Sequence, residues 1–507
     1  MTGERPRVET RSGVVEGRAE SGLAVFRSVP YARAPVGERR WRAPEPETPW
    51  GGVRDASRFG PIAPQRPGVM MRMLGMDGAA SDEDCLTLHL WTPAPSAPSA
   101  RRRPVLVWLH GGGFTAGAGS LPVYDGQHLA RRGDVVVVTV NYRLGALGFL
   151  AWPTPSIAAN VGLLDQIAAL SWVREHAERF GGDPRNVTVF GESAGAISIG
   201  ALLGAPATRG LFRRAILQSG AAHNVSSPDA GRRVAEEFLA AAQHPADAAA
   251  LRALPLDAVL EAQQRVVDQS WRTVEGLAFQ PVVDGGAIPR EPLAAVGEGT
   301  ARDVSLLVGT NRDEWNLFAL PDAKLRDLDE AGLQRRLLRN PPGARGGEDP
   351  EALARRAIEV YRAARAARGE AVAPRDLWLA LQTDRVFRIP AIRLAERQQR
   401  HQPQTYAYLF AWPSPALGGA LGACHGLEVP FAFGSTRGAT ARLVGDGPEV
   451  ERLAHRMQDA WLAFARTGDP GWPAYDPPKR STLVLGRECA LESDPMGEER
   501  RFWDGRL

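Results

Sequence analysis

The sequence contains little cysteine and no long apolar run. Three cysteines, Cys85, Cys424 and Cys489, make an odd count without C-x-x-C spacing, which suggests neither a disulfide framework nor a zinc site. Reduced thiols are typical of a cytoplasmic protein, and we expect that location. The N-terminal segment has no apolar stretch, and the longest apolar runs are far shorter than the roughly 20 residues of a membrane helix. We therefore expect a chain that is neither exported nor inserted in a membrane.

The sequence also lacks a large excess of positive or negative side chains. The 507 residues include 61 Lys and Arg and 58 Asp and Glu, for a formal net charge of +3. This charge is too small to build a surface that attracts polyphosphates, so we exclude nucleic acid as a partner. The hydrophobic share of 44% and the charged share of 23% are those of ordinary globular proteins.

The chain alternates short apolar runs with helical periodicities. Residues 7–28 show apolar stretches separated by Gly-containing turns, which predicts an antiparallel β-ribbon. Apolar residues recur at helical spacing over 163–173 and 450–464. Buried strands are predicted at 105–109, 135–140, 187–190, 215–218 and 304–308. The pattern predicts an α/β fold: a single domain over residues 1–507 with a large, mostly parallel central sheet and a helical insertion around 320–375.

The strongest local signal is a G-x-S-x-G pentapeptide at residues 191–195. A buried strand precedes it and an apolar helix follows, which is the context of a nucleophile elbow. On such a sharp turn the neighbouring backbone comes close, so Gly191 and Gly195 are needed on either side of Ser193. A simple Gly-Ser turn is the alternative, and the flanking strand and helix disfavour it.

A glycine cluster follows another predicted strand, in His110-Gly111-Gly112-Gly113-Phe114. Without Cβ atoms, these residues let backbone N–H groups approach a ligand atom, as an oxyanion hole requires. A flexible turn and a phosphate cradle are the alternatives. The absence of a following G-K-[ST] disfavours the phosphate cradle.

A reactive serine needs a general base and an orienting carboxylate. His176, His455 and His89 lie within predicted helices or strands, where structural histidines are expected. His425 lies in a late loop after the predicted strand at 405–412, as the chain order Ser, acid, His requires.

The candidate acids follow the predicted strand at 304–308. Loops at the carboxyl ends of parallel strands are where α/β enzymes place their sites. Asp313 and Glu314 are adjacent there, so only one faces inward, and their spacing does not choose between them.

These segments together resemble type B carboxylesterases, the cholinesterase-like branch of the α/β-hydrolases, and in particular their bacterial para-nitrobenzyl-esterase-like members. The resemblance spans nearly the whole chain. It includes residues 26–32, 83–86, 110–114, 141–143, 160–166, the elbow, 218–220, 281–285, 313–314, His425 and 467–470.

The resemblance implies an α/β-hydrolase fold with Ser193 as nucleophile, His425 as base and Glu314 as acid. It implies that the oxyanion donors are the backbone N–H groups of Gly112, Gly113 and Ala194. The residues that would line or support the pocket are Glu192, Ser219 and Phe114.

The implied activity is hydrolysis of carboxylic esters of broad, mainly apolar specificity through an acyl-enzyme. The expected partner is a small-molecule ester, with no metal and no organic cofactor. Acyl transfer through the same intermediate is one alternative. A non-catalytic cholinesterase-like binding protein is another, and the intact Ser193 and His425 disfavour it. The sequence leaves open whether the chain is a monomer or a homo-oligomer.

Two features depart from the family pattern. Relatives often pair the cysteine equivalent to Cys85 with one upstream, but residues 61–65 contain none. The loop at 66–84 contains no aromatic residue to hold a choline cation. It contains instead Met70, Met71, Met73 and Met76, which suit either a permissive apolar rim or buried packing.

Overall fold

The strands form two sheets in the computed structural model of the chain, which describes residues 5–66, 68, 78–93, 102–152, 157–243, 247–270, 277–343 and 348–506. One sheet has the order β1-β2-β5, and the other has eleven strands in the order β14-β13-β12-β11-β10-β9-β7-β8-β6-β4-β3. The strands are β1 (Arg7–Glu9), β2 (Val14–Glu16), β3 (Arg18–Glu20), β4 (Leu23–Pro30), β5 (Val53–Asp55), β6 (Thr87–Thr92), β7 (Arg103–Leu109), β8 (Val136–Val140), β9 (Gly182–Glu192), β10 (Arg214–Gln218), β11 (Ser305–Asn311), β12 (Thr405–Phe410), β13 (Ser481–Leu485) and β14 (Cys489–Ser493).

The seven strands from β8 to β13 in the sheet order run parallel to their neighbours. Antiparallel pairs flank them, from β3 to β8 at one end and at β14 at the other. This confirms the predicted mostly parallel sheet and the N-terminal antiparallel strands. β11 extends three residues beyond its predicted end at 308, because Gly309 to Asn311 continue the pairing with β12 up to Asn311↔Phe410.

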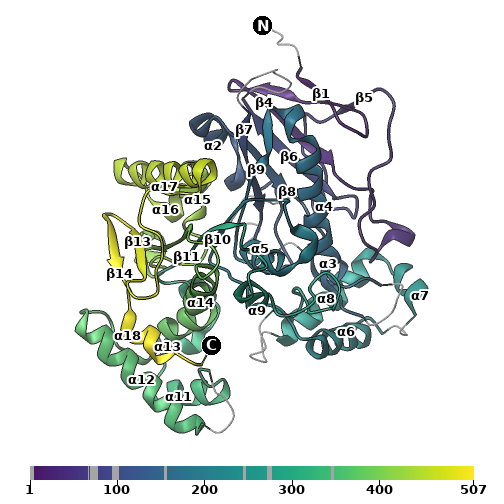
Figure 1. The fold of residues 1–507 in the computed structure, drawn as a ribbon. Coiled ribbons are helices and arrows are strands. Elements are labelled where there is room, and N and C mark those ends of the chain that lie inside the picture. Colours follow the sequence, from purple (N-terminus) through teal and green to yellow (C-terminus); the bar gives the residue numbers. More distant parts are fainter. Residues whose placement is uncertain are drawn as a thin grey trace.

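Helices cover both faces of the large sheet (Figure 1). They are α2 (Gln127–Gly133), α3 (Gly145–Phe149), α4 (Val161–His176), α5 (Ala194–Gly204), α6 (Pro228–Ala242), α7 (Ala248–Arg252), α8 (Leu256–Ser270), α9 (Pro292–Gly297), α10 (Trp315–Phe318), α11 (Glu330–Arg339), α12 (Pro350–Ala367), α13 (Pro374–Thr383), α14 (Ile389–Gln398), α15 (Val429–Phe433), α16 (Ala441–Val444), α17 (Pro448–Thr467) and α18 (Gly497–Phe502). None of the described helices combines the length and apolarity that crossing a bilayer needs.

β7 shows why the central strands have no polar face. Val105 and Val107 pack into the core shared with α4 and α5, whereas Leu106 and Trp108 pack into the core shared with α2, α15 and α17. A parallel strand covered by helices on both faces must be apolar at every position. This explains the continuous apolar runs that predicted these strands.

The helices predicted around 320–375 form a third core. Leu333 of α11, Leu353 of α12 and Leu377 of α13 pack with Phe502 and Trp503 near the C-terminus. Figure 1 shows α11, α12, α13 and α18 gathered at the end of the molecule away from the N-terminal strands.

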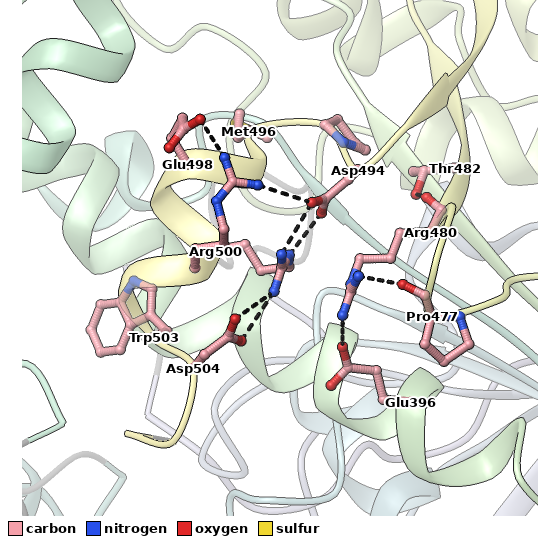
Figure 2. A network of polar contacts seen from close by, with 12 residues as sticks. Glu396, Pro477, Arg480, Thr482, Asp494, Met496, Glu498, Arg500, Trp503 and Asp504 are labelled. Carbon is pink, nitrogen blue, oxygen red and sulfur yellow. Dashed lines mark hydrogen bonds and ion pairs between the residues drawn. The ribbon is translucent and has the colours of Figure 1, made fainter.

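Ion pairs join the C-terminal helix to the rest of this end (Figure 2). Arg500 of α18 contacts Asp494, with Nε 2.8 Å from Oδ1, and Asp504, at 3.0 Å. Arg480, just before β13, reaches Glu396 of α14 at 3.0 Å. The contact between Arg480 and Glu396 holds α14 in place. The segment that precedes α14 reaches the site described below.

A buried ion pair anchors the segment that follows β8. Arg143 Nη2 lies 2.6 Å from Asp165 Oδ1 and Nε lies 2.8 Å from Oδ2, and the two side chains are 3% and 0% exposed. Arg143 also donates to the Arg42 carbonyl, at 2.8 Å. Removing one partner of such a pair leaves an uncompensated charge in the interior.

We therefore expect Asp165→Asn to lower the free energy of unfolding by about 3 to 5 kcal/mol. Urea denaturation followed by circular dichroism measures the change. The control is Asp459→Asn, which breaks an equally bidentate pair with Arg132 at the surface. That control should cost about 1 kcal/mol or less, and equal losses in the two variants would contradict the assignment.

Candidate active site

The serine of the G-x-S-x-G pentapeptide lies on a strained turn between β9 and α5. Ser193 has φ 54° and ψ −123°, a backbone conformation that is costly for a residue with a side chain. A Cβ on Gly191 would lie 2.7 Å from the Leu109 carbonyl oxygen, and one on Gly195 would collide with the same atom. The close approach predicted on both sides of Ser193 is confirmed.

The glycine loop after β7 lies against this turn. A Cβ on Gly111 would lie 2.6 Å from Glu192 Oε2 and 3.0 Å from Ser193 Cβ. Gly112 and Gly113 have φ values of 114° and 60°, which favour glycine. Tyr142 donates its hydroxyl to the His110 carbonyl at 2.7 Å and so holds the start of the loop.

The late histidine and the carboxylate meet at the same edge of the sheet. His425 Nδ1 lies 2.6 Å from Glu314 Oε2, and Glu314 is fully buried. A carboxylate accepts, so Nδ1 bears the proton and Nε2 faces the elbow. Asp313 instead accepts from the Ala423 backbone N–H at 2.8 Å. The structure therefore places Glu314, and not Asp313, against the imidazole.

The position of His425 relative to the elbow is defined by the residue before the serine. His425 Nε2 lies 3.0 Å from Glu192 Oε1. Register explains the convergence: Leu109 pairs with Gly191, and Gln218 pairs with both Glu192 and Gly309. Parallel strands end at one edge of their sheet, so the loops that follow them meet there.

Buried carboxylates surround the imidazole. Burial alone would lower the pKa of His425, but Glu192, Glu314 and Glu428 outweigh burial and raise that pKa to about 9. Burial raises the pKa of Glu192 to about 8, against the effect of His425. Both groups therefore favour their protonated forms, and the titration of each depends on the charge of the other.

Two phenylalanine rings line the other sides of the imidazole. The ring centroids of Phe318 and Phe387 lie 5.0 and 4.8 Å from that of His425. Phe387 belongs to a π-helical turn, η6 (Asp384–Arg388), between α13 and α14. Such turns often occur at functional sites.

The remaining predicted residues have distinct positions. Ala194 begins α5, directly after the serine. Ser219 follows β10, is fully buried with φ 53°, and its hydroxyl has no hydrogen-bond partner in the described part of the chain. Phe114 is fully buried and packs edge-to-face on Phe149 at 4.8 Å, so its ring belongs to the core.

Sequence reasoning missed three of these neighbours, Glu428, Phe318 and Phe387. Glu428 lies three residues after His425, and Phe318 lies four residues after Glu314, so proximity in sequence was the only available signal for them. Phe387 comes from a distant segment, for which the sequence offered no signal.

The histidines at 89, 176 and 455 lie within helices or strands, as predicted. His89 in β6 is fully buried and accepts from the Ser28 backbone N–H at 2.9 Å. His176 ends α4 and accepts from the Arg11 N–H at 3.1 Å. Neither contacts the site. His455 lies within α17, as the helical spacing predicted.

Other expectations concern thiols, metal ions and the methionine loop. Cys85 and Cys424 are buried free thiols, and Cys489 is an exposed one. Within the described ranges, no group of three or more His, Cys, Asp or Glu side chains is arranged to hold a metal ion. The predicted methionine rim at Met70, Met71, Met73 and Met76 lies outside the described residues.

Comparisons with known proteins agree on one family. The model of the carboxylesterase family matches residues 4–503. The chain is 38% identical to the para-nitrobenzyl esterase of Bacillus subtilis over 97% of both chains, and 39% identical to the phenmedipham hydrolase of Pseudarthrobacter oxydans over 96% of both. The crystal structure of a carboxylesterase from Geobacillus stearothermophilus superposes with a TM-score of 0.85 at 40% identity, covering 98% of this chain and all of the other.

These matches confirm the resemblance inferred from the motifs and the α/β-hydrolase fold. The matches cover nearly the full length of both compared proteins, so they concern the whole fold and not a shared fragment. The chain belongs to the carboxylesterase family, and it is a serine hydrolase of carboxylic esters.

Proposed function

We propose that Ser193 attacks the ester carbonyl, that His425 takes its proton, and that Glu314 orients His425 and stabilises its cation. The acyl-enzyme is then hydrolysed by water that the same imidazole activates. The observation that supports this most directly is the 2.6 Å contact between His425 Nδ1 and Glu314 Oε2, which turns Nε2 toward the elbow.

The oxyanion donors in this proposal are the backbone N–H groups of Gly112, Gly113 and Ala194. Their support is the glycine loop packed against Ser193 and the start of α5 directly after it. Donors fixed before the reaction stabilise the tetrahedral oxyanion without reorganisation.

His425 is a base only when Nε2 is unprotonated. The charge of the neighbouring Glu192 raises the pKa of His425 and so affects the pH above which the base is free. Glu192 thus supports the site through its charge beside the base.

We further propose broad, mainly apolar ester specificity and a cytoplasmic location. The apolar rings of Phe318 and Phe387 beside His425 support the first, and the buried free thiols of Cys85 and Cys424 support the second. A panel of para-nitrophenyl esters of increasing acyl length, with phenmedipham included because of the relative so named, defines the range. Added alcohol acceptors separate hydrolysis from acyl transfer.

Ser193→Ala should lower kcat/KM for a short para-nitrophenyl ester by at least about 10⁴-fold, because the nucleophile is lost. An organophosphate should label the wild type once and leave the variant unlabelled. Retention of most activity by the variant would refute the assignment, and failure of the wild type to label would favour a non-catalytic binding protein.

Glu314→Gln should cost less than loss of the serine but still on the order of 10³- to 10⁴-fold in kcat, because the imidazole loses its orientation and its counter-charge. Asp313→Asn is the matched control and should cost less than about tenfold, since Asp313 contacts the Ala423 backbone and the Arg312 side chain but not His425. If Asp313→Asn were the more damaging change, the acid would be misassigned.

Glu192→Gln should move the acid limb of the kcat/KM profile to lower pH by roughly one unit. The limb reports deprotonation of His425, and the Glu192 carboxylate raises the pKa of that imidazole, so its removal lowers the pKa. Glu236→Gln, a change on the exposed face of α6, serves as control. An acid limb that stays in place or moves to higher pH would contradict this effect of Glu192 on His425.

A further inference from the structure

Asn311 contacts three parts of the site: Glu314, the backbone of Cys424 and the carboxylate of Glu428. The proposed mechanism gives Asn311 no role. It is the last residue of β11 and is fully buried. Its backbone N–H donates to Glu314 Oε1 at 2.7 Å. Its side-chain Nδ2 donates to the Cys424 carbonyl at 2.7 Å and to Glu428 Oε2 at 2.5 Å.

These acceptors enclose the catalytic pair. Cys424 directly precedes His425 and Glu428 follows it by three residues, so one amide nitrogen contacts both ends of the histidine segment. The backbone bond occupies Glu314 Oε1 and leaves Oε2 for His425 Nδ1. One residue therefore sets the separation of the acid and the base.

Glu428 is a fully buried carboxylate without a cation as partner in the described structure. It accepts from two neutral amides, Asn311 at 2.5 Å and Gln218 at 3.1 Å. The indole N–H of Trp461 donates to Gln218 Oε1 at 3.0 Å and holds that amide in place. Glu428 in its charged form depends on these two donors.

Titratable groups face Glu428 and His425 from several elements. They are Glu192 of β9, Glu314 before α10, Cys424 of the histidine loop, Tyr408 of β12 and Tyr124 of η2 (Pro122–Tyr124). The pKa of Glu428 is raised, because burial and Glu314 outweigh the hydrogen bonds from Asn311 and Gln218 that lower it. The charge of Glu428 in turn contributes to the raised pKa of His425.

We propose that Asn311 is a positioning residue of this esterase site, whose side-chain amide holds the acid and histidine loops together and favours the charged form of Glu428 beside His425. This inference rests on the proposed roles of Ser193, Glu314 and His425. The proposal adds Glu428 and its donor Asn311 to the groups that determine the pH at which His425 is unprotonated.

The test uses Asn311→Leu in the full-length enzyme, which keeps the side-chain size and the backbone bond to Glu314 but removes the amide donor. The loss of positioning should lower kcat about 10- to 100-fold with KM nearly unchanged. Glu428 without its donor takes up a proton, the pKa of His425 falls, and the acid limb of the kcat/KM profile moves to lower pH by roughly one unit.

A double-mutant cycle connects the shift to Glu428. Glu428→Gln alone should move the limb in the same direction, because it removes the same charge. Adding Asn311→Leu to Glu428→Gln should produce no further shift, since no charge remains for the amide to maintain.

Asn316 offers a matched control. Its Nδ2 also joins the acid side to the loop before His425, donating to the Leu421 carbonyl at 3.1 Å, but it contacts no carboxylate. Asn316→Leu should leave the limb in place.

The proposal would be overturned if the acid limb of the kcat/KM profile did not move in Asn311→Leu. It would also be overturned if the shifts of the two single variants added up in the double variant. If Asn311→Leu does not fold, an unmoved limb in Glu428→Gln overturns it equally. If Ser193→Ala is inactive and the acid limb of Asn311→Leu does not move, only the role of Asn311 is rejected. If Ser193→Ala is active, the proposed mechanism itself is rejected.

Discussion

The contact between the His425 imidazole and the Glu314 carboxylate is the constraint on which the rest of the site depends. An imidazole with two similar nitrogens needs a partner that fixes which one is protonated, and Glu314 is that partner at 2.6 Å. Because Glu314 is fully buried, water does not compete for the bond. The strand register, the helix packing and the ion pairs together keep these two groups in place.

Several buried polar groups serve the backbone around the site. Tyr142 holds the start of the glycine loop, and the neighbouring Arg143 is fixed by Asp165 in the interior. Ion pairs of Arg480 and Arg500 fix α14 and α18 (Figure 2). The π-helical turn before α14 places Phe387 against the imidazole. A site that reacts by positioning and electrostatics needs this rigidity.

Charge distinguishes this site from a simple three-residue arrangement. Glu192, Glu314 and Glu428 surround one imidazole, and none of the three is paired with an Arg or Lys in the described structure. Their mutual repulsion and burial favour protonation somewhere in the cluster. The elbow therefore lies next to three buried carboxylates, one of which, Glu428, accepts hydrogen bonds from the amides of Asn311 and Gln218.

Sequence patterns by themselves determined the layered α/β architecture, the elbow at Ser193 and the glycine loop at 110–114, because each depends on local spacing or on apolar runs between short turns. They did not decide whether Asp313 or Glu314 is the acid, because the direction in which each of two adjacent side chains points depends on the path of the backbone. They also missed Phe387, and they placed the end of β11 too early, which removed Asn311 from the sheet. Those features depend on contacts between segments that are far apart in the chain. Only the tertiary structure determines which of these segments lie together in the buried site.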